Sequence, residues 1–456
     1  MRLSLSISFI LTPFLVFNFC AGATTTEQPT AIFHAHDEPY LQVSTYVCEL
    51  AKQGYSHVQI APAQQSNPDP LPSPLEWAVR YQPVDFRVIA GRGNEEDLKK
   101  LTDTAKRCNV QVIADVVFNH MANMEEFRDL NFPTFSPADF NPRCDINYSD
   151  GNTTTERSCW LNGDLPDLNQ SRPNVREIQK AHLQKLMDLG VAGFRFDAAK
   201  HIEPRYIQEY VNYINTASQG KAWNYLEVIE DNDTRSEEYT PIAAVTDFRL
   251  CQSLLQAFSF GGDLRSLRVP IALNDTRSVT FGVNHDTDVE LNPGFPVCRF
   301  GDRTDTALAS AYVLARESGT PLILGKDNLT VPYIRYGVNF RQIMRQRGKE
   351  GRGVKETVLA AVDKPTLLLM ERGSEGFFVV NKATEKFDIP VLDLSLTKLE
   401  GCYRELRTNF TVAIERRNDG KKYITRWGTW NRGGMQVQGR DALYFIREPF
   451  NQCATR

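Results

Sequence analysis

The feature that most constrains the fold is an alternation of short apolar runs with longer amphipathic segments over residues 31–325. The apolar runs consist mostly of Val, Ile, Leu and Phe without strict alternation, which is typical of strands covered on both faces. Amphipathic helices are predicted over 94–109 and 172–190, between such runs. Repeated strand–helix units predict an α/β fold with a parallel sheet. The six predicted strands lie at 57–62, 110–120, 191–199, 224–230, 278–286 and 320–325.

The run "VAGFRFDAAKH" (191–201) combines a buried strand with charged residues. Side chains alternate between the two faces of a strand, so Phe194 and Phe196 are expected to pack against helices while Arg195 and Asp197 share the opposite face. A neighbouring Arg lowers the pKa of a carboxylate, so Asp197 is expected to stay ionised. A structural ion pair is the alternative reading of these two residues alone.

Other predicted strands also end in polar residues, namely Asn119, His120, Glu227, Asn284, His285 and Asp286. Glu227 lies 30 residues after Asp197, and Asp286 lies 59 residues after Glu227. A (β/α)₈ barrel uses about 31 residues per unit, so these gaps correspond to one and two repeats. The carboxyl ends of barrel strands surround one mouth, and we therefore expect the three carboxylates to converge there.

Three converging carboxylates suit retaining glycoside hydrolysis, which needs one ionised carboxylate and one protonated carboxyl. Asp197 beside Arg195 fits the ionised role, and Glu227, between apolar Leu226 and Val228, fits the acid with a raised pKa. A metal site built from the same carboxylates is the competing interpretation, although the sequence contains no HExxH pattern.

Two segments interrupt the strand–helix pattern. Residues 121–169 are rich in Asn, Asp, Pro, Thr and Ser and are too long for a simple connection, which indicates a functional insertion. From residue 352 onward, short strands separated by turn residues predict a separate all-β domain.

Four motifs in register carry a family resemblance: "DVVFNH" (115–120), "GFRFDAAKH" (193–201), "LEVIE" (226–230) and "FGVNHD" (281–286). With them the chain resembles the alpha-amylase family of glycoside hydrolases, most closely its animal-type branch. The resemblance implies a TIM barrel with a domain B inserted after strand 3 and a C-terminal Greek-key β domain. The implied ranges are a signal peptide at 1–23, the barrel at 24–120 and 170–351, domain B at 121–169, and the β domain at 352–456.

The resemblance also implies roles for individual residues. Asp197 would be the nucleophile, Glu227 the general acid/base, and Asp286 the third carboxylate that favours the distorted transition state. Core packing is the alternative for the two aromatic residues of the substrate-binding set. The implied substrate-binding residues are Trp77, Tyr81, His120, Arg195, Lys200, His201 and His285.

Ions follow from the same resemblance. A structural Ca²⁺ would bind Asn119, Asp167 and the backbone carbonyls of Arg157 and His201, and such oxygen ligands suit this hard cation. Animal-type relatives bind chloride through residues that include a basic side chain, but Leu322 stands at that position, so we expect weak chloride binding or none. Two further departures are Ala78, which replaces an aromatic platform, and Val283, which replaces a carboxylate.

The N-terminus and the cysteines indicate secretion. Arg2, an apolar run and the small residues Ala21 and Ala23 form a signal-peptide pattern, and no later run is long enough to span a bilayer. Loss of Cys20 with the signal leaves eight cysteines, an even number suited to an oxidising compartment, whose spacing does not fix the pairing. Animal-type pairing implies Cys48–Cys108, Cys144–Cys159 and Cys402–Cys453, and leaves Cys251–Cys298. Sequons permit glycosylation at Asn147, Asn152, Asn169, Asn232, Asn274, Asn328 and Asn409.

Composition sets the remaining limits. The chain of 456 residues has 41% hydrophobic and 24% charged residues, as a folded protein does, and its net charge of −4 argues against binding to nucleic acid. We expect a monomeric, extracellular endo-acting alpha-amylase that binds starch, glycogen and maltooligosaccharides. The alternatives are a hydrolase or transglycosylase of short maltooligosaccharides and a non-catalytic carbohydrate-binding relative.

Overall fold

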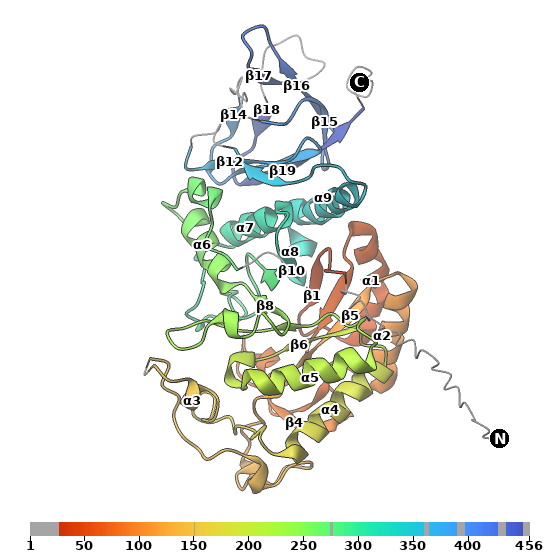
Figure 1. Ribbon diagram of the computed structural model, residues 1–456, viewed down its shortest axis with the longest axis vertical. Coiled ribbons are helices and arrows are strands. Elements are labelled where there is room, and N and C mark those ends of the chain that lie inside the picture. Colours follow the sequence, from red (N-terminus) through yellow and green to blue (C-terminus); the bar gives the residue numbers. More distant parts are fainter. Residues whose placement is uncertain are drawn as a thin grey trace, which may run out of the picture.

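A closed barrel of eight parallel strands forms the centre of the molecule (Figure 1). The computed structural model describes residues 27–149, 151–273, 277–359, 364–389, 397–426 and 435–449. Around the ring the order is β1-β10-β9-β8-β7-β6-β5-β2, so the strands follow the chain and the last closes on the first. The barrel strands are β1 (Ile32–Ala35), β2 (His57–Ile60), β5 (Gln111–Val116), β6 (Gly193–Phe196), β7 (Tyr225–Leu226), β8 (Ala244–Thr246), β9 (Ser278–Thr280) and β10 (Thr320–Leu324).

The α/β barrel expected from the sequence is confirmed, with two differences in its strands. β1 and β8 were not predicted, although they are no shorter than β7 and β9, which were. The predicted strands are also longer than the observed ones. For example, β7 contains only two residues, and the rest of the predicted strand 224–230 forms loop.

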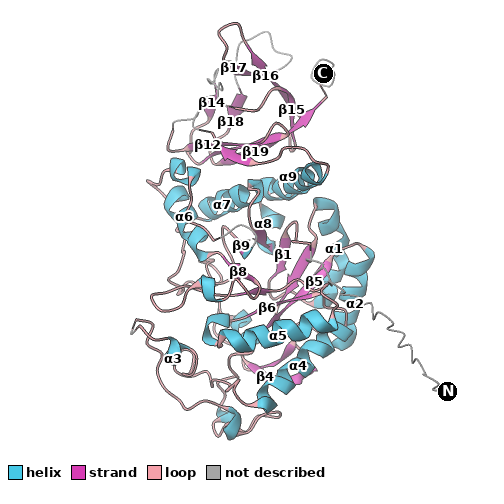
Figure 2. Cartoon of the chain, viewed as in Figure 1, coloured by secondary structure: helices cyan, strands magenta, loops and turns pink. Residues whose placement is uncertain are grey.

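Helices cover the outside of the barrel (Figure 2). Asn94 caps α2, because its side chain accepts a hydrogen bond from the Asp97 amide at 3.0 Å. The Asp97 side chain in turn accepts a hydrogen bond from the Asn94 amide at 3.1 Å. Phe194 and Phe196 are fully buried, and Phe196 stacks on Tyr210 of α5 at 6.2 Å, so both point outward as predicted. The helices are α1 (Tyr40–Gln53), α2 (Glu95–Arg107), α4 (Pro173–Asp188), α5 (Pro204–Ala217), α6 (Phe248–Phe258), α7 (Arg303–Ala315), α8 (Gly325–Thr330) and α9 (Pro332–Lys349).

The connections that rise above the carboxyl ends of the strands build the walls of the site. After β2 the chain forms a hairpin of β3 (Gln64–Ser66) and β4 (Pro83–Ile89), which encloses the 3-10 helix η1 (Glu76–Tyr81). Between β5 and α4 lies the inserted segment, whose aromatic rings Phe127 and Phe132 stack at 4.5 Å. Its short helices, and those elsewhere in the barrel, are η2 (Glu125–Phe127), η3 (Pro137–Asp139), α3 (Thr153–Glu156), η4 (Ala199–His201), η5 (Ser236–Glu238) and η6 (Leu264–Arg268).

The C-terminal part is an all-β unit with a hydrophobic core of its own, as expected. In the view of Figure 1 it lies beyond α7 and α9, which separate it from the barrel. Its seven-stranded antiparallel sheet has the order β11-β12-β13-β19-β15-β16-β17, and β14 pairs with β18 in a second small sheet. These strands are β11 (Glu356–Val358), β12 (Leu367–Arg372), β13 (Gly376–Asn381), β14 (Phe387–Ile389), β15 (Gly401–Glu405), β16 (Thr411–Arg416), β17 (Lys422–Arg426), β18 (Met435–Val437) and β19 (Asp441–Glu448).

Buried cations join the β unit to the barrel. Lys382, which follows β13, donates to the carbonyls of Ala257 and Ser259 at the end of α6, at 2.8 and 2.9 Å. A third bond reaches the Gly262 carbonyl. Arg372 of β12 donates to the carbonyl of Ala315 at the end of α7, at 2.9 Å. Each cation satisfies carbonyls that have no further helical partner, which stabilises the junction.

Disulfide bonds join Cys48 to Cys108, Cys144 to Cys159 and Cys251 to Cys298. Cys402 is also disulfide-bonded, but Cys453, its partner in the sequence interpretation, lies outside the described residues. The predicted signal peptide at 1–23 and the sequon at Asn274 lie outside the described residues as well. Within the described ranges, no helix combines the length and the apolar character needed to cross a membrane.

Candidate active site

Three carboxyl groups stand at the carboxyl ends of barrel strands. Asp197 follows β6 and Glu227 follows β7 directly, and their amides bond the carbonyls of Val116 and Phe196 at 3.0 and 2.9 Å. The hydrogen-bonding pattern between strands thus continues one residue past each strand and fixes both side chains at the mouth. Asp286 lies in the loop after β9 and lines the same cleft.

One buried guanidinium holds three carboxyl groups together. Arg195 is only 3% exposed, and its Nη1 lies 2.6 Å from Asp115 Oδ2 and 2.8 Å from Asp197 Oδ1. Its Nη2 contacts Glu227 Oε1. The three acids come from the neighbouring strands β5, β6 and β7, and Asp115 lies opposite Arg195 in the β5–β6 register. Asp197 and Glu227 are therefore held side by side on adjacent nitrogens of one group.

Burial dominates the protonation of this cluster. It raises the pKa of Asp197 well above the ordinary value, although Arg195 acts in the opposite direction. Arg195 lowers this pKa as expected, but burial and the charges of Glu227 and Asp115 outweigh it, so the expectation that the net pKa of Asp197 is low is wrong. Burial also raises the pKa of Asp286, and the charge of Glu227 and a hydrogen bond between the two carboxyls raise it further. Several carboxyls around one cation favour the retention of a proton at the mouth.

The carboxyls open onto a cleft of about 460 Å³. Its walls come from the β3–β4 hairpin, from the inserted segment and from the loop after Asp286. All the expected substrate-binding residues line it except Arg195, which lies behind the carboxyls. The lining residues are Leu71, Trp77, Ala78, Tyr81, Gln82, His120, Tyr148, Leu161, Asn162, Leu165, Asp197, Ala198, Lys200, His201, Glu227, Ile229, His285, Asp286, Asn292, Phe295 and Val297.

Aromatic rings form one side of the cleft. The Tyr81 ring stacks on His285 with a centroid distance of 5.4 Å and an angle of 18°, and its hydroxyl donates to Asp115 Oδ2 at 3.0 Å. Trp77 packs edge-on against Tyr81 at 5.7 Å, and its indole N–H donates to the Leu291 carbonyl at 3.0 Å. Both rings are thus fixed in place before any ligand binds.

The sequence reasoning missed three residues that position this site. Asp115 anchors Arg195 and Tyr81, Asp231 forms an ion pair with Lys200, and the ring of Tyr148 lies 4.6 Å from the Lys200 ammonium. A signal for two of them was present. Asp115 is a charged residue inside an apolar run, and Asp231 directly follows the predicted strand at 224–230.

Oxygen atoms suited to a hard cation gather where the inserted segment meets the barrel. The Asn119 side-chain oxygen faces two acceptors, Asp167 Oδ1 at 3.3 Å and the His201 carbonyl at 3.0 Å. Burial raises the pKa of the Asp167 carboxyl well above its ordinary value, opposed by a bond from Asn141 at 2.7 Å. An amide oxygen, a carboxylate and a carbonyl that face one another fit the ligands that Ca²⁺ prefers.

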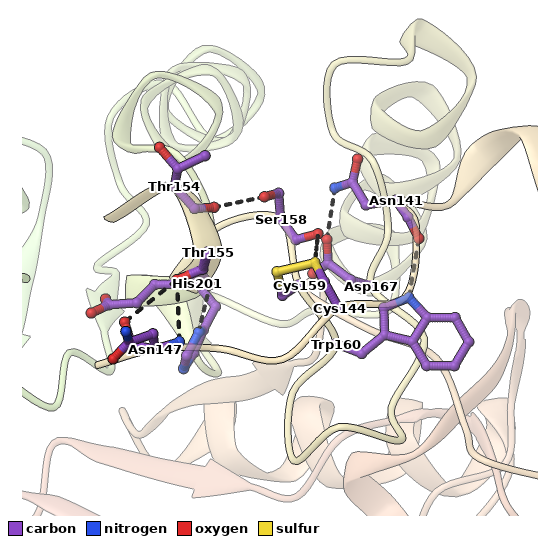
Figure 3. Close-up of a disulfide and its surroundings, with 11 residues drawn as sticks. Asn141, Cys144, Asn147, Thr154, Thr155, Ser158, Cys159, Trp160, Asp167 and His201 are labelled. Carbon is purple, nitrogen blue, oxygen red and sulfur yellow. Dashed lines mark hydrogen bonds between the residues drawn. A yellow bond between two sulfur atoms is a disulfide. The ribbon is translucent and has the colours of Figure 1, made fainter. Parts of the chain in front are cut away.

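The neighbourhood of these oxygens is cross-linked (Figure 3). The Cys144–Cys159 disulfide lies between Asp167 and His201 in this view. The His201 ring bonds the Glu156 carbonyl through Nδ1 at 2.8 Å, so the end of α3 lies against it. Arg157 follows α3, and its side chain bonds Glu238 at 2.8 Å.

Comparisons with known proteins agree with this architecture. Residues 50–241 match the model of the alpha amylase catalytic domain. An alpha-amylase of Aeromonas hydrophila is 30% identical over 406 residues, which cover 77% of this chain and 84% of the relative. An alpha-amylase of the beetle Phaedon cochleariae is 33% identical over 61% of each chain. The solved structure of a mutant Eisenia fetida alpha-amylase I with maltohexaose has a TM-score of 0.74 at 20% identity, over 94% of this chain and 99% of that one. The chain therefore belongs to the alpha-amylase family of glycoside hydrolases.

Proposed function

We propose that this chain is a secreted, endo-acting alpha-amylase. It hydrolyses internal α-1,4-glucosidic bonds of starch and glycogen with retention, through a covalent glycosyl-enzyme. The observation that carries the proposal is the shared contact of Asp197 and Glu227 with Arg195, because it places two carboxyls side by side in one cleft. A retaining mechanism requires that the nucleophile and the acid lie as close to each other as two such neighbouring carboxyls do.

Each carboxyl has a role in this mechanism. Glu227 protonates the leaving glycosidic oxygen while Asp197 attacks the anomeric carbon, and Glu227 then takes a proton from the water that releases the sugar. The Ala198 amide, which donates to Glu227 Oε2 at 2.9 Å, orients that carboxyl. Asp286 binds substrate hydroxyls and favours the oxocarbenium-like transition state. Glu227 raises the pKa of Asp286 through its charge and a hydrogen bond, which favours the protonated form of Asp286.

Substrate binding is proposed for the residues that line the cleft. Tyr81 stacks under the reacting glucose and Trp77 under a neighbouring one, while His120, Lys200, His201 and His285 bind hydroxyl groups. Arg195 acts through the carboxyls that it holds. Ala78 leaves one part of the wall without an aromatic platform, so glucose binding there is expected to be weaker.

We propose that Asn119, Asp167 and the His201 carbonyl hold a structural Ca²⁺, together with the Arg157 carbonyl. The facing oxygen atoms of the first three support this. The ion would join the inserted segment to the barrel and balance the buried Asp167 carboxylate. It takes no part in the bond cleavage.

Chloride activation is not part of the proposal. Leu322 is buried in β10, where it lies opposite Ile32, and offers no charge. The Arg195 guanidinium already contacts three carboxyls. The Asn284 side chain accepts from the Thr287 amide at 2.9 Å and is used within its own turn.

Secretion is supported by the disulfide bonds, which form in oxidising compartments. Glycosylation is then possible at exposed sequons. Asn328 is 2% exposed and bonds Tyr55 at 3.0 Å and Gln53 at 3.0 Å, so we expect it to stay unmodified.

The decisive experiment compares the wild type with Asp197→Asn on soluble starch and on maltoheptaose. The wild type should collapse the viscosity of starch before much reducing sugar appears, and proton NMR should show α-anomeric products first. The variant should bind starch but lose turnover by about 10⁴-fold or more. Release of glucose or maltose with little early loss of viscosity would favour the short-substrate alternative. Turnover retained in the variant would contradict the nucleophile assignment.

A further inference from the structure

Three of the seven histidines meet behind the wall of the cleft. His34 belongs to β1, His36 follows that strand, and His285 precedes Asp286. Each offers one ring nitrogen, and these three atoms lie within 4.8 Å of one another. The ring centroids are 5.0 to 5.4 Å apart. The three rings either share a ligand or pack as a plain aromatic cluster.

The hydrogen bonding of the cluster distinguishes these two possibilities. Among the described residues, both ring nitrogens of His34 and both of His36 lack a hydrogen-bond partner. His34 is fully buried. A buried polar atom without a partner has lost its hydrogen bonds to water, and aromatic packing does not replace them. Coordination to an ion would satisfy one nitrogen on each ring.

The protonation state of the three histidine rings also favours a shared ligand. Burial lowers the pKa of His34 and His285 well below the ordinary value and that of His36 to about 4. All three rings are therefore neutral near pH 7, and neutral imidazole is the form that binds metals.

We propose that His34, His36 and His285 form a binding site for a divalent transition-metal ion of the Zn²⁺ class. Imidazole nitrogens suit this class, whereas Ca²⁺ and Mg²⁺ prefer oxygen ligands. Zn–N bonds of about 2.0–2.1 Å put tetrahedral nitrogens about 3.4 Å apart, so small side-chain rotations close the site. His36 is partly exposed as a residue, although both of its ring nitrogens are buried.

Nearby charges sharpen the selectivity. Lys326 and Arg195 lie close enough to lower the pKa of His36 by their charge. They would repel any cation held by charge alone, so the site selects an ion through coordination bonds. Asp288 acts on the pKa of His36 in the opposite direction, and it forms an ion pair with Lys326 at 2.7 Å.

Occupation of the site is expected to inhibit hydrolysis. His285 Nε2 lies 3.5 Å from Asp286 Oδ2, and its ring stacks on Tyr81. An ion would fix the His285 ring and draw the adjacent carboxylate toward the charge, as carboxylates bind metal-ligating histidines. This consequence rests on the proposed function, in which His285 and Asp286 contact the sugar; the binding of the ion does not.

The test uses the full chain, stripped of transition metals and supplied with Ca²⁺. Co²⁺ is titrated while the visible d–d bands are recorded, and Zn²⁺ then displaces it. We expect one ion per chain, and His36→Phe should weaken binding by about tenfold or more. The matched control is His57→Gln, because His57 lies at the opposite end of the barrel and both its ring nitrogens are bonded, to Ser56 and Gln111. Binding should be unchanged in that variant.

X-ray absorption of the Zn²⁺-loaded wild type needs no variant and should show three nitrogen neighbours at about 2.0 Å. Oxygen-only coordination, the absence of d–d bands, or binding that His36→Phe leaves unchanged would each overturn the site. In starch hydrolysis, Zn²⁺ should inhibit the wild type and the His57 variant more strongly than the His36 variant. A chain that binds Co²⁺ as expected but hydrolyses no starch would contradict the proposed function and leave the metal site standing.

Discussion

Replacing Asp115 by Asn should raise the stability relative to wild type as the pH rises toward neutral, and at the same time impair catalysis. Asp115 is fully buried, and its Oδ2 accepts bonds from Arg195 and Tyr81 at 2.6 and 3.0 Å. Its Oδ1 has no partner among the described residues. Asparagine has the same shape and keeps one acceptor oxygen, but it cannot ionise.

The magnitude follows from the pKa. Burial raises the pKa of Asp115 from 3.8 to about 6, even though Arg195 lowers it. One pKa unit corresponds to about 1.4 kcal/mol, so the ionised carboxyl costs the folded state about 3 kcal/mol. Below the ordinary pKa, Asp115 is protonated in both the folded and the unfolded state, so its burial costs no stability through ionisation. As the pH rises, the unfolded chain releases its proton first, so wild-type stability falls until the pH passes about 6.

The assay is urea unfolding of wild type and variant at several values between about pH 4 and pH 7. The stability of Asp115→Asn relative to wild type should rise by about 2.5 kcal/mol over that interval, because a small part of the cost is already present at about pH 4. An amide N–H without a partner at the Oδ1 position adds a cost of about 1–3 kcal/mol, which is the same at every pH. Tyr81→Phe is the matched control, because it removes one bond and keeps the charge. A relative stability that does not change with pH would refute the reasoning.

Catalysis should respond in the opposite sense. Without the Asp115 charge, Arg195 has one anionic partner fewer and is less firmly fixed behind Asp197. Burial is the main cause of the raised pKa of Asp197, but Asp115 adds to it. We therefore expect a lower kcat and an acidic limb of the pH–rate profile that moves to lower pH.

Three further outcomes are expected. Lys382→Met should lower the free energy of unfolding by about 3 kcal/mol or more, because three carbonyls lose a charged donor. The loss would be measured as a reduced Tm. Lys364→Met, at an exposed position, should not lower the free energy of unfolding in this way. Chelation of Ca²⁺ should lower the Tm of the wild type, and Asp167→Asn should abolish that response; a Tm indifferent to chelator in the wild type would contradict the calcium proposal. Exchange of chloride for gluconate should leave the hydrolysis rate unchanged, as Leu322 supplies no charge, and a clear activation by chloride would contradict this.

The periodicity of apolar residues predicted the elements that are long enough to show a repeat. α2 and α4 lie within the predicted ranges, and the alternation in β6 correctly puts Arg195 and Asp197 on one face. β1 and β8 were missed although they are no shorter than β7 and β9, so strand length alone does not explain the omission. The repeat spacing predicted Asp286 at the mouth of the barrel, where it does line the cleft, but it lies in the loop after β9 and not at the end of a strand.

Properties that depend on several segments together were not accessible from the sequence. The protonation of Asp197 was judged from one neighbour, Arg195, but it depends on how many acids share that neighbour and how deeply they are buried. His34 and His36 meet His285 because the closed barrel brings the end of β1 near the loop after β9. A short stretch of sequence contains no signal that predicts which strands meet when the barrel closes.

The register of the barrel is what makes the site possible. Arg195 contacts acids from β5, β6 and β7, and each contact requires that these strands pair as they do. A slip of one residue in β6 would turn Arg195 and Asp197 outward and bring Phe194 and Phe196 into the barrel. The apolar preference of those two Phe residues for the helix layer therefore fixes the register, and the register assembles the carboxyls. The charged residues in the strand are thus held in place by the apolar residues between them.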